Sequence, residues 1–164
     1  MNQLAIPIRN VILLVFIVSS SFTFGQNTKQ EKMKALSFMV GEWIGTSKGF
    51  ENGKITREVA AYQEIAYDLD QHILVIKLNS ESLLLHTIIY YDQTDDTYYY
   101  HPFSKRGMKR SPAKFEDGKL VVWNSDTRRY TFSRTEDGGF REHGEQFIDG
   151  KWVTYFEDIF QNSN

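Results

Sequence analysis

The sequence predicts an all-β protein: an antiparallel up-and-down β-barrel of about ten strands with a short N-terminal helix. From residue 41 onward, short segments rich in Tyr, Phe, Val, Ile and Thr are separated by turn residues about every eight to twelve positions. Asp-Gly, the strongest short-range hairpin signal, recurs at 117–118, 137–138 and 149–150. Closing such a sheet removes the exposed edges that invite aggregation, which favours a barrel.

The first 25 residues are typical of a secretory signal peptide. Arg9 supplies the positive charge, VILLVFIV is an apolar core too short to span a bilayer, and small residues lead to Gly25. The alternative is an uncleaved membrane anchor. The chain has no cysteine, which excludes a lipid-modified N-terminal Cys and any disulfide. We therefore expect a periplasmic or secreted protein that is not a lipoprotein.

Residues 26–164 are long enough for one domain with a core of its own. The formal charge of −2 argues against nucleic acid as the partner. The helical candidate is TKQEKMKALSFM, residues 28–39, where the spacing places Met33, Leu36 and Val40 on one stripe.

The motif G-x-W-x-G begins the first strand. A barrel end needs a plug, and Trp43 fed by the short helix suits that role. Gly41 and Gly45 would let the backbone bend and approach its neighbours closely around the indole ring. We expect these three residues to close the barrel.

A short helix, this motif and a meander of strands together resemble the calycin superfamily. FMVGEWIGTSKGF and the ending DGKWVTYFEDIF are similar to lipocalin-like domains of secreted bacterial proteins of unknown function. That resemblance implies a small, mostly apolar molecule in the barrel lumen. The first strand also resembles nitrobindin-type barrels, which implies haem held by a histidine near the C-terminus and action on nitric oxide or peroxynitrite. Residues 151–161 contain no histidine, which departs from that pattern. Of the four histidines, His143 is the better haem-ligand candidate, because the expected register places Phe132 and Phe156 beside it.

Two-residue Asp-Gly turns would fix the register of the last three strands. The 149–150 turn sets Phe147 opposite Trp152, His143 opposite Phe156, Arg141 opposite Asp158 and Glu142 opposite Glu157. The 137–138 turn sets Phe132 opposite His143 and Arg134 opposite Arg141. If the aromatic face lines the lumen, the ligand-binding residues are Tyr130, Phe132, Arg134, Arg141, His143 and Phe156. A register slip of one residue would make these charges a solvated face instead.

The interpretation is a carrier without catalysis, for an apolar or amphipathic ligand whose carboxylate would meet an arginine. An opposed Glu142–Glu157 pair could support acid–base chemistry, but on an outward face it is only a tolerated pair in water. No sequence-local zinc pattern or phosphate loop occurs, so no metal or catalytic residue is expected. The basic loop KRGMKR, residues 105–110, is a solvated tip or a guide for anions. A non-catalytic envelope module that binds another protein is a further alternative, and the oligomeric state is open.

Overall fold

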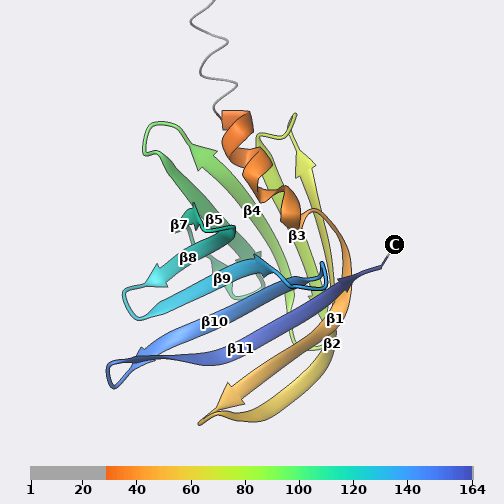
Figure 1. Ribbon diagram of the computed structural model, residues 1–164, viewed down its shortest axis with the longest axis vertical. Helices are drawn as coiled ribbons and strands as arrows, with labels where there is room; N and C mark the ends of the chain where they lie inside the picture. The colour runs from red at the N-terminus through yellow and green to blue at the C-terminus, as the bar shows by residue number, and fades with distance from the viewer. Residues whose placement is uncertain (1–28, 164) are drawn as a thin grey trace, which may run out of the picture.

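The computed structural model describes residues 29–163 and is an antiparallel β-barrel with a short helix across one end (Figure 1). The predicted signal peptide lies outside the described residues. After a helical turn at 29–34, the elements are η1 (Ala35–Met39), β1 (Gly41–Glu51), β2 (Lys54–Asp68), β3 (Ile73–Ser80), β4 (Leu84–Asp92), β5 (Thr97–Ser104), β6 (Gly107–Met108), β7 (Ser111–Glu116), β8 (Lys119–Ser125), β9 (Arg128–Arg134), β10 (Phe140–Ile148) and β11 (Lys151–Asn162).

The sheet closes on itself. Neighbouring strands pair antiparallel in chain order, β4 pairs with β5, and β1 pairs with β11 from Trp43↔Asn162 to Gly49↔Phe156. The two-residue strand β6 pairs with β5 beside this ring. Within the described residues, ten strands therefore close the barrel, and the predicted fold class is confirmed.

Two of the three Asp-Gly pairs form the expected tight hairpins. Asp117-Gly118 has φ values of 49° and 72°, and Asp149-Gly150 has values of 48° and 78°. Positive φ at both central residues is the signature of a type I′ turn. At 137–138 only Gly138 has positive φ, so the third pair belongs to a different loop.

The helix covers one end of the barrel (Figure 1). Met33, Leu36 and Met39 are fully buried, whereas Val40, predicted on the same stripe, is 36% exposed. Val40 already has extended backbone (ψ 130°), so its side chain leaves the helical stripe and Met39 takes the inner place. The Tyr67 hydroxyl donates to the Met33 carbonyl over 2.8 Å, which ties the helix backbone to β2.

Trp43 joins the helix to the barrel. Its indole is 3% exposed, and Nε1 donates to the Met39 carbonyl over 2.8 Å. A Cβ on Gly41 would lie 3.2 Å from the Trp43 ring, and the φ of Gly41 is +151°. A Cβ on Gly45 would lie 1.9 Å from the backbone oxygen of Ile159, so only glycine lets β1 approach β11 this closely.

Candidate functional site

The loop between β9 and β10 determines which residues of β10 face the interior. Residues 135–139 form a five-residue connection closed by the Thr135 N–H donating to the Gly139 carbonyl over 3.0 Å. Phe140 consequently pairs with Arg134, and Glu142 pairs with Phe132. The predicted pairings Phe132–His143 and Arg134–Arg141 are wrong by one residue, which turns every side chain of β10 to the opposite face.

A β-bulge shifts the register between β10 and β11. Phe147 pairs with Trp152 as predicted, but the ladder shifts between Gly144 and Glu145, and Glu142 then pairs with Asp158. The predicted pairings His143–Phe156, Arg141–Asp158 and Glu142–Glu157 are therefore wrong. One extra residue on the bulged strand, Tyr155, accounts for the shift.

An open cavity of about 530 Å³ lies at the end of the barrel opposite the helix, and a lobe of about 280 Å³ adjoins it. Both are lined by Leu83, Leu85, Arg106, Glu142, Tyr155 and Phe156. This volume is in the range of small-molecule sites in proteins.

The floor of the cavity is polar and buried. Glu142 and Asp158 lie directly opposite each other on β10 and β11 and are 9% and 4% exposed. Gln63 on β2 is 1% exposed, and its Nε2 donates to Glu142 Oε2 over 3.2 Å. Beyond them toward the helix lie the fully buried rings of Phe140 and Phe160. The two carboxyls thus separate the apolar core from the cavity.

Burial shifts the pKa of each carboxyl upward, toward the protonated form. Burial, followed by the charge of Asp158, raises the pKa of Glu142, although the hydrogen bond from Gln63 acts in the opposite direction. Burial also raises the pKa of Asp158, opposed by a hydrogen bond from Ser47 and by the charge of Arg57. Two opposed carboxyls in a poorly solvated site resist simultaneous ionisation.

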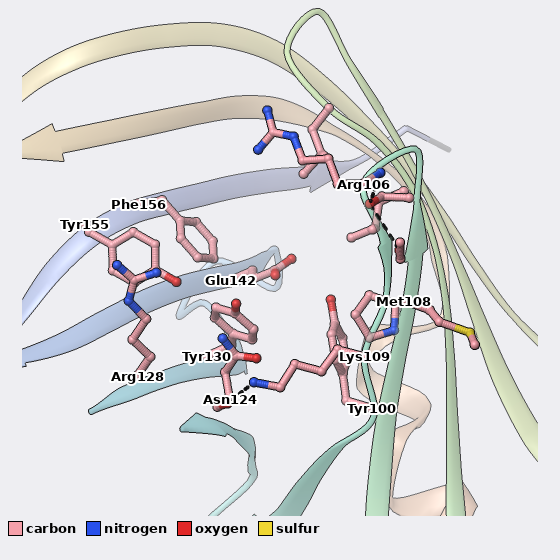
Figure 2. A pocket seen from close by; sticks show the side chains of 15 residues that line it. Tyr100, Arg106, Met108, Lys109, Asn124, Arg128, Tyr130, Glu142, Tyr155 and Phe156 are labelled. Carbon is pink, nitrogen blue, oxygen red and sulfur yellow. Dashed lines mark hydrogen bonds between the residues drawn. The ribbon is translucent and has the colours of Figure 1, made fainter. Parts of the chain in front are cut away.

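The walls of the cavity are aromatic. The ring centroids of Tyr100 and Tyr130 are 6.1 Å apart, and those of Tyr130 and Phe156 are 5.8 Å apart. Figure 2 shows the Glu142 carboxyl among the side chains that line the cavity, with the rings of Tyr130 and Phe156 on one side of it. Burial raises the pKa of Tyr100 and of Tyr155, so both hydroxyls stay neutral near pH 7 and can donate hydrogen bonds.

The rim of the cavity is basic. Arg57, Arg106, Lys109 and Arg128 line the cavity and its lobe, and all four are exposed. Lys109 donates to the Asn124 carbonyl, as the dashed line in Figure 2 marks. Among residues 29–163, no carboxylate forms an ion pair with any of these four side chains. The rim therefore presents uncompensated positive charge to an incoming molecule.

Of the six residues predicted to bind a ligand, Tyr130 and Phe156 line the cavity, and Phe132 is fully buried beside it in the core. Arg134 is exposed at the end of β9 that leads into the 135–139 loop near the helix.

Arg141 and His143 occupy the face of β10 opposite Glu142. Arg141 pairs with Glu157 over 2.6 Å, and His143 Nε2 lies 3.8 Å from Glu145 Oε2. No histidine is among the residues that line the cavity or its lobe. No cluster of three potential metal ligands occurs among the described residues either.

Sequence reasoning missed the floor and most of the rim. The sequence alone puts Glu142 on the outer face and Asp158 opposite Arg141, because both assignments follow from the register expected for tight Asp-Gly turns. Gln63 had no sequence signal at all. The basic loop 105–110 was the one usable signal, and it supplies Arg106 and Lys109.

No family model matches this chain, and no curated protein matches it in sequence. Within the described residues, no helix combines the length and the apolar character needed to cross a bilayer.

Proposed function

We propose that this protein is an exported barrel of calycin, lipocalin-like type that binds a small amphipathic anion in its mouth cavity without catalysing a reaction. The observation that carries the proposal is one cavity with aromatic walls and an unpaired basic rim. The closed antiparallel barrel with its N-terminal helix is compatible with that superfamily.

The chemistry of the cavity supports a ligand with an apolar body and an acidic head. Tyr130, Tyr155 and Phe156 offer flat apolar surface to the body. The guanidinium groups of Arg106 and Arg128 can bind a carboxylate, sulfonate or phosphate through two parallel hydrogen bonds. In this proposal Arg106 and Arg128 bind the anion, a role that the sequence analysis assigned to Arg134 and Arg141.

Binding of octanoate, followed by isothermal titration calorimetry, tests the proposal. The double variant Arg106→Gln/Arg128→Gln is expected to bind octanoate at least tenfold more weakly, because charge-assisted hydrogen bonds contribute about 1.5–3 kcal/mol each. Arg134→Gln is the matched control, since Arg134 is an exposed arginine outside the cavity. Equal loss of affinity in the control, or no binding by the unaltered protein, would contradict the proposal.

The haem alternative has no geometric support in the cavity, because His143 faces the Glu145 side of β10. Action on nitric oxide or peroxynitrite would need a haem site elsewhere. For that reason we propose the anion carrier alone.

A further inference from the structure

Two buried oxygen acceptors at the floor of the cavity have no hydrogen-bond partner among the described residues. They are Gln63 Oε1 and Asp158 Oδ1, on side chains that are 1% and 4% exposed. Buried acceptors are normally satisfied, since leaving one without a donor costs about 1–3 kcal/mol. Apart from a proton on one of the two carboxyls, the described residues therefore give these two oxygens no hydrogen-bond donor.

The local chemistry explains the shortage. Gln63 directs its amide N–H to Glu142, which leaves its own carbonyl without a donor. Ser47 supplies one hydrogen bond to the Asp158 carboxyl, and Oδ1 of that carboxyl has no partner among the described residues. Asp158 and Glu142 both line the lobe of the cavity, whereas Gln63 lies behind Glu142 and is not among the lining residues.

We propose that the floor of the cavity is a subsite for a protonated amine, so that the molecule bound here carries an amine at one end and an anion at the other. This inference rests on the proposed function, which assigns the anionic end to the basic rim. An ammonium group has three donors and no acceptor, which matches a floor of unpaired acceptors.

Charge favours an ammonium group over a hydroxyl group. The ammonium would lie beside Glu142 and Asp158, would attract the ionised carboxyl of the pair and would favour ionisation of the other. The rings of Tyr130 and Phe156 can add cation–π attraction. The charge of Arg57, an exposed residue that lines the lobe, already acts on Asp158, but the two form no ion pair among those of the described residues.

The test compares octanoate with 8-aminooctanoate by calorimetry at pH 7, together with the six-, ten- and twelve-carbon pairs to allow for depth. At the best-fitting chain length, we expect the ω-amino acid, such as 8-aminooctanoate, to bind at least tenfold more tightly than the unsubstituted acid of the same length, such as octanoate. In a cavity without the subsite, burying an unpaired ammonium would instead weaken binding.

Two variants locate the effect. Asp158→Asn and Glu142→Gln are each expected to reduce the preference for the amine to less than about threefold, because each removes one of the two carboxyls that face the ammonium. Glu142→Gln keeps the shape of the side chain and serves if Asp158→Asn fails to fold. Glu157→Gln, on the same strand but paired with Arg141, is the matched control and should keep the preference.

The outcomes separate the two proposals. Tight octanoate binding with no preference for the amine at any length would mean that water satisfies the floor, which overturns the subsite alone. Absence of binding by both series would overturn the carrier proposal and the subsite with it. A preference that survives both Asp158→Asn and Glu142→Gln would also refute the assignment to this floor.

Discussion

Glu142 on β10 lies directly across the ladder from Asp158 on β11, and both carboxyls are buried at the floor of the mouth cavity. The bulge sets this pairing, because an unbulged hairpin would place Glu142 opposite Glu157. The five-residue loop sets the separate register of β10 against β9. The pair is the feature that distinguishes this lumen from a purely apolar one.

The pair predicts a pH dependence of stability. The folded pKa of Glu142 is above its ordinary value of 4.5, so its contribution to stability is fully present below about pH 4.5 and is lost as the pH rises toward the folded pKa. Glu142→Gln cannot ionise, so it should raise the free energy of unfolding at pH 8 by about 1–2 kcal/mol and change it less at pH 5. Urea unfolding at the two pH values measures this.

Glu145→Gln is the control for that measurement. Glu145 lies on the same strand but pairs with Arg129 over 2.7 Å on the opposite face. Its removal should not stabilise the protein at pH 8. A Glu142→Gln variant whose stability falls in parallel with that of the unaltered protein between pH 5 and 8 would show that Glu142 is ionised without penalty.

At Gly45 we expect that even one added methyl group destabilises the protein. A Cβ there would lie 1.9 Å from the Ile159 carbonyl oxygen, which is backbone and cannot rotate away. Gly45→Ala should therefore lower the free energy of unfolding by about 3 kcal/mol by forcing β1 from β11. Gly49→Ala on the same strand would meet its nearest atom at 3.6 Å and should be neutral or slightly stabilising. Similar losses in both variants would contradict the close approach.

Trp43 should make a separate contribution to the stability of the protein, at the end of the barrel that the helix covers. Trp43→Phe removes the donor to the Met39 carbonyl and leaves space beneath the helix, so a loss of about 2 kcal/mol is expected. Trp123→Phe, at a tryptophan 40% exposed on the outer wall, should cost much less. Thermal unfolding by circular dichroism compares the two, and equal melting temperatures would refute a closing role for Trp43.

The basic rim predicts that binding depends on salt. Affinity for octanoate should fall several-fold between 20 mM and 500 mM NaCl, because exposed charges are screened over a shorter distance at higher ionic strength. Octanol, which has the same tail without the charge, should bind with little salt dependence. Parallel titrations of the two compounds measure this, and equal salt dependence would place the carboxylate away from the rim.

The barrel could be predicted from the sequence because its signals are local. Asp117-Gly118 and Asp149-Gly150 adopt the positive φ values that this dipeptide favours, and alternating apolar residues follow from a half-buried sheet. Trp43, between two glycines in the sequence, is buried beside the helix and donates to the Met39 carbonyl.

The cavity could not be predicted because its signals are tertiary. Asp137-Gly138 looks like the other two turns, but Gly139 packs so closely against β11 that its Cβ would lie 2.4 Å from the Phe160 carbonyl oxygen. That contact joins residues 21 positions apart in the sequence, and it accompanies the five-residue loop that takes the place of the expected two-residue turn. The bulge beside Gly144 depends likewise on the ring of Phe156, which occupies the place of the missing Cβ. Neither can be read from neighbouring residues.

Native mass spectrometry of the protein purified from the cells that produce it tests the carrier proposal most directly. We expect a reproducible added mass, released on denaturation, from a molecule with an acidic group and an amine. The Arg106→Gln/Arg128→Gln variant should carry less of it than Arg134→Gln does. A mass equal to that of the polypeptide alone, unchanged after incubation with octanoate, 8-aminooctanoate and a lipid extract, would contradict the account.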